Sequence, residues 1–366
     1  MFKPTTKPKN YQRLETIVNT NLSMRDVIKD KVGEEALEYF TQFIDIDNKT
    51  TSVVSTTNII NIINKDNVKS IINLSRINNI RFINKFFESV NEKLEIGDTY
   101  IGCVETINAR KRRKRRSRIP VIRDFVFILE FIFLRVFPKV SGLKKIYFNV
   151  TRGRNRLLSK SEALGRLVSC GFKIIDFNTI NGYLYFVVQK EKEPYYDMNP
   201  SYGLLYKMPR VGKNGKTIHV YKFRTMHPYA EYLQSYIIEK NGYAKSGKPA
   251  DDFRLTPWGK LFRKYWLDEL PQLLNVLKGD MKLVGIRPVS RFYFNQIPKD
   301  LQELRLTQKP GCIPPYVSLN RVSTVDSVLN AERDYLLEKL KNPYTTDTKY
   351  FFSALYNIII KNKRSA

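Results

Sequence analysis

A proline within a densely charged segment constrains this chain more than any other single feature. Residues 251–288 read DDFRLTPWGKLFRKYWLDELPQLLNVLKGDMKLVGIRP, in which five carboxylates stand among seven lysine and arginine side chains. Pro271 disfavours helical geometry at the residue before it and suits the first turn of a new helix. We therefore expect a helix to begin at Pro271 and to end at Gly279, so that Asp268 and Glu269 lie just before its N-terminus.

The position of Asp268 and Glu269 is compatible with two roles, a catalytic or metal-binding role and a capping role. The partial positive charge of a helix start, together with Arg263 and Lys264 upstream, favours keeping at least one carboxylate ionised at neutral pH. Adjacent carboxylates also repel each other, and a divalent cation is the usual relief. The alternative, equally compatible with the local spacing, is that the pair only caps a surface helix.

Three segments in the second half of the chain carry a resemblance to a known family. They are RVGKNGKTIHVYKFRTM (210–226), the charged segment 251–288, and LTQKPGCIPP (306–315). In this order and spacing they resemble the motifs of the bacterial sugar transferases, which are monotopic polyprenyl-phosphate phosphoglycosyl transferases. The resemblance covers residues 200–335 and implies a helix-rich catalytic domain, which we place at 196–366.

The resemblance also implies an activity. Members of this family transfer a sugar 1-phosphate from a UDP-sugar to undecaprenyl phosphate and release UMP, the first step in assembling an exopolysaccharide, capsule, O-antigen or other glycan. They act at the cytoplasmic face of the bacterial inner membrane and use Mg²⁺. We expect the same here, with anionic membrane lipids as further partners. The sequence names neither the sugar nor the glycan pathway, and it is compatible with a homo-oligomer.

By position, the Asp-Glu dyad of the family corresponds to Asp268 and Glu269. The resemblance implies that both carboxylates serve in catalysis and hold Mg²⁺, and we expect Asp268 to form a covalent phosphosugar intermediate. One departure from the family is Ile286, because the family usually has a Pro-Arg-Pro turn there; Arg287 and Pro288 remain. We expect this turn to be looser but to keep its positive charge.

Basic residues near the dyad are candidates for binding phosphate. In the strand-like stretch YKFRTM, Tyr221 and Phe223 alternate with Lys222 and Arg224, so that one face can pack while the two cations point together. The alternative for these cations is a solvated face. The predicted phosphate-binding residues are Lys222, Arg224, Arg254, Arg263 and Arg287, with Asp280 and Pro288 as candidates for supporting the site.

The first half of the chain has the pattern of an α/β unit. After an N-terminal extension over residues 1–50, short apolar runs alternate with an amphipathic segment in 51–105. The later string LSKSEALGRLVSCGFKIIDF, followed by a hairpin turn at Asn181, resembles the C-terminal part of class I methyltransferase-like domains. However, no glycine-rich loop follows a first strand to hold adenosylmethionine. We therefore predict that residues 51–195 form a degenerate, Rossmann-like scaffold, which gives an α/β unit followed by an α+β catalytic domain.

A basic run and an apolar stretch, residues 110–139, interrupt this unit. The chain has 63 basic and 35 acidic residues, a formal charge of +28 that points to nucleic acid, anionic lipid or phosphorylated substrates. The run Arg110–Arg118 alone does not distinguish these partners. Phe125–Phe137 is apolar except for Glu130 and Arg135, and it is too short to span a bilayer. We expect it to dip into an anionic leaflet without crossing; the alternative is a buried core helix.

The family resemblance agrees with membrane insertion at this stretch. The family enters the membrane by a re-entrant helix preceded by basic residues and an aspartate, for which Arg123 and Asp124 are the candidates. This chain departs from the family in placing a long segment between that helix and the catalytic motifs. The C-terminal segment, which includes Tyr350 and ends in Lys361, Lys363 and Arg364, is a second candidate for the membrane surface.

Two other functions compete with this prediction. A nucleic-acid-binding protein would use the basic run and bind with a steep salt dependence, and a methyltransferase would need the missing glycine loop; we predict neither. The three cysteines, Cys103, Cys170 and Cys312, lie far apart without metal-ligand spacing, which indicates buried, reduced thiols. The polar start of the chain has no apolar h-region, so we expect no signal peptide.

Overall fold

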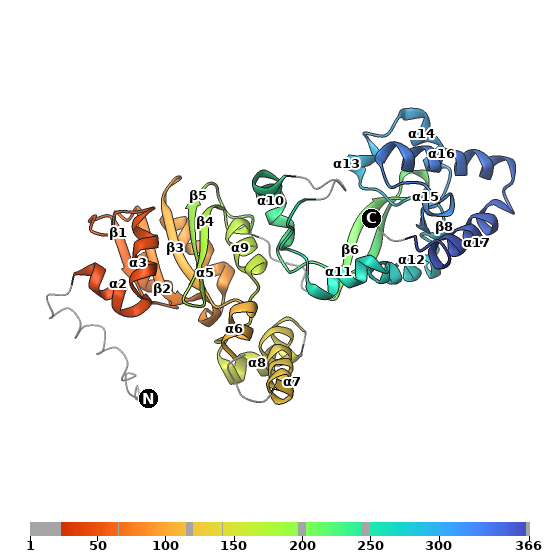
Figure 1. Cartoon of the computed structure of the whole chain (residues 1–366). Helices are drawn as coiled ribbons and strands as arrows, with labels where there is room; N and C mark the ends of the chain where they lie inside the picture. The colour runs from red at the N-terminus through yellow and green to blue at the C-terminus, as the bar shows by residue number, and fades with distance from the viewer. Residues whose placement is uncertain are drawn as a thin grey trace, which may run out of the picture. The chain divides into compact units, whose positions relative to one another are not determined.

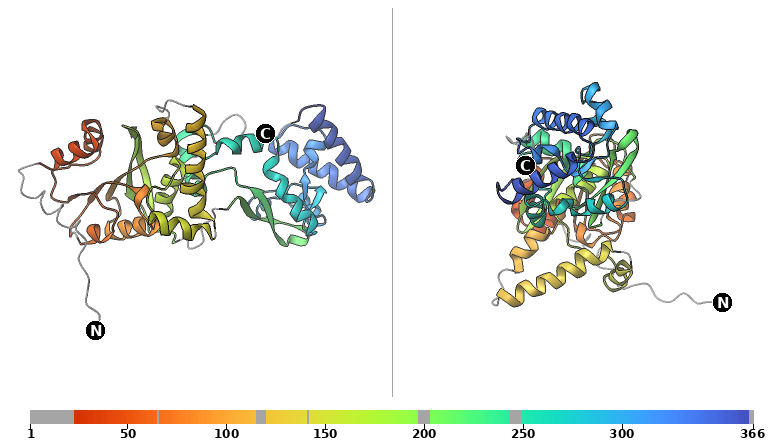
Figure 2. Two further views of the ribbon diagram at one scale, coloured as in Figure 1. Left: turned by 90° about the horizontal axis from the view of Figure 1, so that it is seen from below. Right: turned by 90° about the vertical axis from the view of Figure 1, so that its right-hand side faces the viewer.

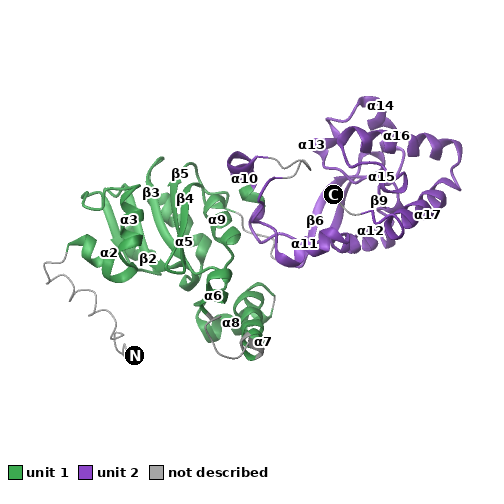
Figure 3. Cartoon of the chain, viewed as in Figure 1, with its two compact units in different colours: residues 1–198, 231–233 green, residues 199–230, 234–366 purple. Residues whose placement is uncertain are grey.

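The computed structural model describes residues 23–64, 66–114, 120–140, 142–196, 203–242 and 249–363 (Figure 1). The chain divides into two compact units (Figure 3): unit 1 comprises residues 1–198 with 231–233, and unit 2 comprises 199–230 with 234–366. The sequence placed this division after residue 195. Parts of the predicted membrane segments lie outside the described residues: 115–118 of the basic run, the side chains of Lys114 and Arg123, and Arg364.

Unit 1 is built on a five-stranded sheet in the order β1-β2-β3-β5-β4. Its strands are β1 (Thr51–Val54), β2 (Ser70–Arg76), β3 (Thr99–Val104), β4 (Phe172–Ile180) and β5 (Tyr183–Lys190). The first three are parallel, and β5 pairs antiparallel with both β3 and β4. Asn181 and Gly182, with φ of 49° and 83°, form the predicted hairpin turn, which requires positive φ at both residues. The unit is a mixed α/β fold, as expected, and its Rossmann-like and methyltransferase-like character stays a prediction.

Helices cover both faces of this sheet (Figure 2). The helical segments described in unit 1 are α2 (Met24–Val32), α3 (Glu34–Thr41), α4 (Ile60–Ile63), η1 (Ile77–Asn79), α5 (Ile83–Lys93), α6 (Ile107–Lys114), α7 (Pro120–Phe131), η2 (Ile132–Val136), η3 (Phe137–Lys139), α8 (Leu143–Thr151) and α9 (Lys160–Ser169). Phe40 of α3 belongs to the same buried cluster as Ile101 of β3, whereas Phe87 of α5 packs edge-to-face against Tyr100. Neighbouring strand residues point to opposite faces, so α3 and α5 lie on opposite sides of the sheet.

The N-terminal helices correct one predicted boundary. We expected residues 1–50 to form an extension ahead of the α/β unit. In the structure, Ile28, Leu37 and Phe40 are buried in the main core of unit 1, so from Met24 onward this segment is part of the unit. A sheet that is apolar on both faces needs helices on both sides, and α2 and α3 cover one of the two faces.

The apolar stretch after the basic run is helical and two-faced. It forms α7, one turn of π-helix at η2 and the short η3, and α8 lies beside α7 (Figures 1 and 2). Its packed side contributes Leu134 to a cluster with Tyr147 and Leu157, while its other side exposes large apolar residues. These exposed residues are Ile122, Phe125, Val126, Ile128, Leu129, Ile132 and Val136. Within the described residues, no helix is long and apolar enough to cross a membrane.

The two charges inside this apolar stretch are both paired. Glu130 accepts from Arg110, the first residue of the predicted basic run, and Arg135 donates to Glu162 of α9 at 2.9 Å. Both arginines are buried. The charges that interrupt the apolar pattern in sequence therefore attach the packed face of the segment to the rest of unit 1 and leave its apolar face exposed.

Glu162 is the centre of this attachment. Its fully buried carboxylate receives Arg135 at 2.9 Å, Lys139 at 2.8 Å and Arg166 at 2.9 Å. Burial opposes ionisation, but the attraction of Lys139, Arg135 and Arg166 outweighs it and holds the pKa of Glu162 well below its usual range. One ionised carboxylate thus joins η2, η3 and α9.

Unit 2 contains two small sheets and many helices. Strands β6 (Leu205–Val211) and β7 (Thr217–Phe223) form an antiparallel hairpin across the turn η4 (Lys213–Gly215), and β8 (Lys282–Val284) pairs parallel with β9 (Gly311–Ile313). Its described helical segments are α10 (Gln234–Asn241), α11 (Pro257–Lys264), η6 (Leu267–Gln272), α12 (Leu273–Leu277), α13 (Arg291–Phe294), α14 (Lys299–Leu306), α15 (Pro315–Ser318), α16 (Val325–Lys341) and α17 (Thr346–Ile359), and η5 (Ala230–Leu233) joins the two units in sequence. This helix-rich composition agrees with the predicted catalytic domain.

The last helix, a second candidate for the membrane surface, has one packed side. Its Tyr350 is buried in the core of unit 2 against Tyr335, with ring centroids 5.1 Å apart. Asn357 is also buried and donates to the carbonyl oxygens of Val317 and Ser318. These contacts fix α17 on α15, so only the opposite side of α17 is exposed.

We predict that Glu162→Gln destabilises unit 1 by about 3–5 kcal/mol, because removing one charge leaves buried cations without their counter-ion. Faster amide hydrogen exchange in β3 and β5 would report this loss. Glu95→Gln, a matched change at an exposed site, should stay within about 0.5 kcal/mol. Since the pKa of Glu162 is lowered on folding, its contribution is present at neutral pH and is lost as the pH falls. Equal exchange rates in the two variants at neutral pH would contradict the prediction.

Candidate active site

The carboxylate pair lies in a tighter helix than expected. We predicted a helix start at Pro271, but the structure has a 3-10 helix, η6, that contains Pro271 and runs directly into α12. A proline ring clashes with the carbonyl of residue i−4 in an α-helix, and 3-10 winding, with bonds to i−3, avoids this contact. Trp266 precedes η6 with φ of +57°, so the chain turns sharply after α11. Asp268 and Glu269 therefore occupy the first turn of η6.

A single buried amide fixes this helix against the hairpin. Asn275 of α12 is fully buried, its Nδ2 donates to the carbonyl oxygen of His219 at 2.7 Å, and its Oδ1 accepts from the backbone N–H of Tyr221 at 3.0 Å. The side chain thus pairs with the backbone of β7 much as a neighbouring strand would. This pairing places η6 opposite the next residue of β7, Lys222.

Lys222 and Glu269 form an ion pair across this junction. Their Nζ and Oε1 atoms are 2.5 Å apart. We predicted that Tyr221 and Phe223 would pack while Lys222 faced away, but the buried face of β7 carries Ile218 and Val220, and Lys222 continues that face. The cation is directed at the dyad for this reason.

Asp268 is the more buried carboxylate of the dyad, with 8% of its surface exposed. Burial raises its pKa, the charges of Lys222 and Arg263 oppose the rise, and Glu269 adds to it. Arg263 is itself held in place because its Nε donates to Thr225 Oγ1 at 3.0 Å. Asp268 is therefore a desolvated carboxylate within the field of two cations, the environment that a nucleophilic carboxylate attacking an anionic phosphate needs.

Arg254, a predicted phosphate ligand, is paired within the protein. It is 2% exposed, and its guanidinium makes a two-pronged pair with Asp252, with both N···O distances 2.8 Å. Its remaining bonds go to the Ala230 carbonyl and the Gln234 side chain. These bonds fix the segment before α11 to Ala230 and Gln234 and occupy the guanidinium in this structure, so phosphate binding by Arg254 stays a prediction.

Arg224 also lies apart from Lys222. Its Nε donates to the carbonyl oxygen of Gly203 at 3.1 Å, and its guanidinium lies over the ring of Tyr206 at 5.0 Å. The two cations that we expected to point together therefore have different neighbours. Asp280 is likewise outside the dyad: its N–H donates to the Asn275 carbonyl, and its charge acts on Tyr221.

Arg287 keeps an exposed side chain, but its backbone is held from both sides. Its N–H donates to Glu332 Oε1 at 2.9 Å, and its carbonyl oxygen accepts from Arg305 at 2.7 Å. Glu332 and Arg305 are buried and paired with each other. Ile286, the departure from the family turn, is buried in the core of unit 2. The backbone that we expected to be loose is therefore anchored, next to the half-buried Pro288.

The segment after KPG adjoins the dyad. Burial raises the pKa of Tyr316, the charge of Arg287 opposes the rise and Glu269 adds to it, so Tyr316 lies within electrostatic range of both charges. Burial and Glu269 likewise raise the pKa of the Cys312 thiol to about 11. Cys312 is only partly buried, whereas Cys103 and Cys170 are buried as predicted. The third sequence motif thus meets the second at Glu269.

Asp268 and Glu269 are the predicted magnesium ligands. Among the described residues, no group of three or more His, Cys, Asp or Glu side chains could hold a metal. Mg²⁺ commonly takes one or two carboxylates and completes its shell with water and substrate phosphates. Asp268 and Glu269 match this donor set.

A broad apolar face accompanies the dyad on the same elements. In α11, η6 and α12, the exposed large apolar residues are Trp258, Leu261, Leu267, Leu270, Leu273, Leu274 and Leu277. Leucines are rarely gathered at this density on a water-exposed surface, and such a patch indicates a partner surface or a membrane. The described part of unit 2 thus combines buried charges with an apolar exterior.

Comparison with known proteins finds a family that this unit resembles. Residues 196–359 match the profile of the family described as bacterial sugar transferase. The match does not extend over the α/β sheet of unit 1.

Individual curated proteins are also similar to part of this chain. The galactosyl transferase CpsE of Streptococcus agalactiae is 36% identical over 137 residues, 37% of this chain and 30% of CpsE. The undecaprenyl-phosphate galactose phosphotransferase of Salmonella typhimurium is 41% identical over 112 residues, 29% of this chain and 23% of that protein. The exopolysaccharide production protein ExoY of Sinorhizobium fredii is 41% identical over 113 residues, 30% of this chain and 50% of ExoY. The chain thus spans half or less of the length of these relatives.

Sequence reasoning missed the residues that position the candidate active site. Asn275 is a lone polar residue in the apolar run LLNVL, and such a residue on a short helix can mark a buried hydrogen bond. Glu332 follows the buried Val328 by one helical turn and precedes the buried Leu336 by another, so the periodicity of α16 places it on the packed face. Arg305 follows Leu301 by the same spacing.

We predict that Glu332→Ala lowers kcat about 10-fold or more by releasing the backbone of Arg287, a positional effect of the kind that a small misplacement produces. The decisive measurement is a double-mutant cycle: in an Arg287→Ala background, Glu332→Ala should add little further loss, because it acts through Arg287. Glu338→Ala, on the same helix but paired with Lys349 at the surface, is the matched control. Independent, additive losses at 332 and 287 would show that Glu332 has only a structural role.

Proposed function

We propose that this protein transfers a sugar 1-phosphate from a UDP-sugar to undecaprenyl phosphate at the cytoplasmic face of a bacterial inner membrane. The observation that carries the proposal is the desolvated Asp268, set within the field of Lys222 and Arg263 in a unit that resembles the bacterial sugar transferases. One relative is named as an undecaprenyl-phosphate galactose phosphotransferase, which supports the class of acceptor. Relatives named for galactosyl transfer and exopolysaccharide production support a role in initiating a surface glycan.

In this proposal Asp268 is the nucleophile. A carboxylate oxygen of Asp268 attacks the β-phosphorus of the UDP-sugar, the bond to the bridging oxygen breaks, and UMP leaves. A phosphate oxygen of undecaprenyl phosphate then attacks the phosphorus of the aspartyl phosphosugar and releases the Asp268 carboxylate. Mg²⁺, when bound at Asp268 and Glu269, would neutralise the diphosphate and so reduce its repulsion of the anionic nucleophile.

The surrounding cations have separate roles in the proposal. Lys222 is paired with Glu269 and can turn to the diphosphate as the substrate arrives. Arg263, held by Thr225, supports the ionised form of Asp268. Arg287, exposed on an anchored backbone, is placed to bind a substrate phosphate through its planar guanidinium.

Membrane association is part of the proposal because both substrate class and surface favour it. Unit 1 exposes the apolar face of α7, and unit 2 exposes the leucine-rich face of η6 and α12. A helix with one packed and one exposed apolar face suits an interfacial or re-entrant position, in agreement with the absence of a spanning helix in the described residues. Anionic lipids would then be partners of the basic residues nearby.

We predict that Asp268→Asn lowers UMP release by at least about 1,000-fold while leaving membrane attachment unchanged, because the amide cannot attack phosphorus. In the wild type, rapid-quench assays should give one UMP per enzyme before undecaprenyl phosphate is added, and mass spectrometry should find the phosphosugar on the peptide that carries Asp268. Since the pKa of Asp268 is raised, activity should fall on the acid side at a higher pH than for an ordinary aspartate.

Asp326→Asn, an exposed change on α16, is the matched control and should keep full activity. UMP release that requires the lipid acceptor, with no adduct on Asp268, would contradict the two-step mechanism but not the substrates. Absence of UMP release from any member of a UDP-sugar panel would contradict the proposed function itself.

We further predict that replacing Phe125, Leu129 and Ile132 by Gln moves a large share of the protein from the membrane to the soluble fraction. Each fully buried apolar side chain contributes about 1.5–3 kcal/mol, so three such losses are large compared with typical attachment energies. The matched control is the double change of Ile96 and Ile175, exposed apolar residues elsewhere in unit 1, to Gln. If the α7 variant stays in the pellet after a high-salt wash, the attachment lies elsewhere in the chain.

A further inference from the structure

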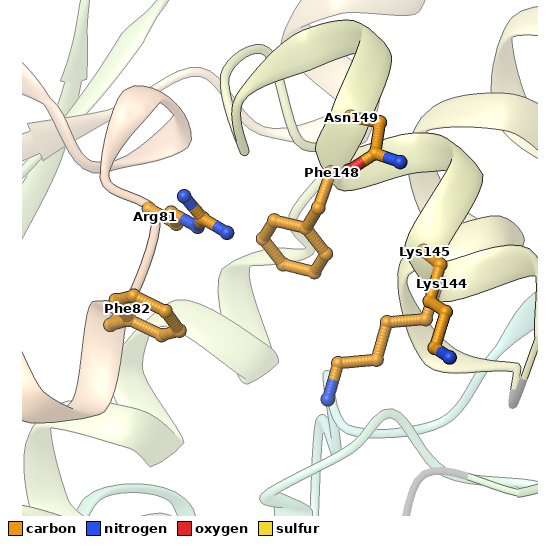
Figure 4. Close-up of a pocket in the computed structure, with 6 residues that line it drawn as sticks. All are labelled: Arg81, Phe82, Lys144, Lys145, Phe148 and Asn149. Carbon is orange, nitrogen blue, oxygen red and sulfur yellow. The ribbon is translucent and has the colours of Figure 1, made fainter.

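Unit 1 contains a basic pocket that the proposed reaction does not use. The pocket has a volume of about 420 Å³ and is lined by Arg81, Phe82, Lys144, Lys145, Phe148 and Asn149 (Figure 4). Arg81 and Phe82 immediately precede α5, and the other four residues belong to α8. Two segments that lie more than sixty residues apart in sequence thus form one recess, with aromatic rings on its wall and cations at its rim.

The charged residues that line this pocket are all positive. Three of its six lining residues are cations and none is a carboxylate. Among the described ion pairs, none uses Arg81, Lys144 or Lys145, although most other clusters of basic residues in unit 1 have an acidic partner, as Arg135 has in Glu162. The pocket also adjoins the start of α5, where Phe82 offers no capping acceptor and the first turn has no acidic residue. A concave site with this charge favours an anion.

Arg81 is held in position before any ligand arrives. Its guanidinium lies over the rings of Phe82 at 5.2 Å and Phe148 at 5.5 Å. Its carbonyl oxygen accepts from Arg156, whose own guanidinium lies over Phe148 at 5.1 Å. Gly153, with φ of +85°, allows the chain to pass so close that an added Cβ would lie 3.0 Å from the Cα atom of Arg81. An arginine fixed by stacking loses little conformational freedom when it binds phosphate.

The surroundings of the pocket indicate where the anion comes from. Phe82, which lines the pocket, is 59% exposed. The exposed apolar face of α7 lies in the same helical cluster. A site for a soluble phosphate compound gains nothing from exposed aliphatic neighbours, whereas a site at a bilayer surface needs cations at head-group level and apolar residues below.

We propose that this pocket binds the phosphate head group of an anionic phospholipid, with Arg81, Lys144 and Lys145 on the phosphate and Phe82 toward the acyl chains. This inference rests on the membrane attachment proposed above. It adds a selectivity for lipid charge that the exposed face of α7 alone would not provide. No covalent step is involved.

The test uses the full-length protein and two kinds of vesicle, one of phosphatidylcholine alone and one containing 30% phosphatidylglycerol. Each lysine near an anionic surface contributes several-fold to binding, so Lys144→Gln/Lys145→Gln should weaken binding to the anionic vesicles about 10-fold or more. Binding to phosphatidylcholine vesicles should not change. Lys69→Gln/Lys173→Gln removes the same charge from exposed sites of unit 1 outside the pocket and should weaken binding several-fold less.

A second measurement reports the pocket itself. Acetylation rates of Lys144 and Lys145, measured by mass spectrometry, should fall with anionic vesicles and stay unchanged with phosphatidylcholine vesicles, with glycerol 3-phosphate or with UMP. Equal losses for the two double variants would overturn the proposal by showing a diffuse charge effect. Protection by a soluble phosphate compound at least as strong as that by anionic vesicles would overturn the lipid as the source.

The two measurements separate this inference from the proposed function. Attachment to phosphatidylcholine vesicles reports the apolar faces, and UMP release reports the transferase site. Unaltered lysine acetylation with wild-type protein bound to anionic vesicles would overturn the pocket while leaving attachment and catalysis intact.

Discussion

The geometry of the candidate active site depends on one buried amide. Asn275 pairs both its polar atoms with the backbone of β7, at His219 and Tyr221. A buried amide without partners costs free energy, so this side chain tolerates no other register of α12 against the hairpin. Because η6 continues directly into α12, the same pairing determines where the dyad faces. The ion pair between Lys222 and Glu269 and the cationic surroundings of Asp268 follow from it.

Two buried carboxylates likewise fix neighbouring elements in one arrangement through their polar contacts. Glu162 joins three cations in unit 1 and fixes the packed side of the apolar helical segment. Glu332 pairs with Arg305 in unit 2, and together they hold the N–H and the carbonyl of Arg287. A buried ion pair adds little net stability compared with apolar packing, but breaking it is costly. In both units such pairs therefore serve to fix one arrangement of a functional segment.

Exposed apolar side chains lie on elements that these polar contacts hold in place. The segment α7–η2 exposes isoleucine, leucine, valine and phenylalanine side chains, and η6 with α12 exposes leucines. Both segments also pack apolar side chains inward, as Leu134 and Val276 do. Apolar side chains on both sides of these helices are consistent with an enzyme whose proposed acceptor is a lipid.

The sequence by itself determined the elements whose rules are local and the motifs whose residues are contiguous. The Asn181–Gly182 turn, the mixed α/β character of unit 1 and the motifs that resemble the sugar transferases all depend on short-range pattern. Tertiary structure alone decided which charges meet. Arg254 and Asp268 lie in one charged segment, yet they have different partners. Arg254 forms an ion pair with Asp252, whereas Asp268 lies within the field of Lys222 and Arg263. Asn275, Arg305 and Glu332 acquire their roles from partners 18 to 56 residues away, and a contact at such separation depends on how whole elements pack, which no local periodicity encodes.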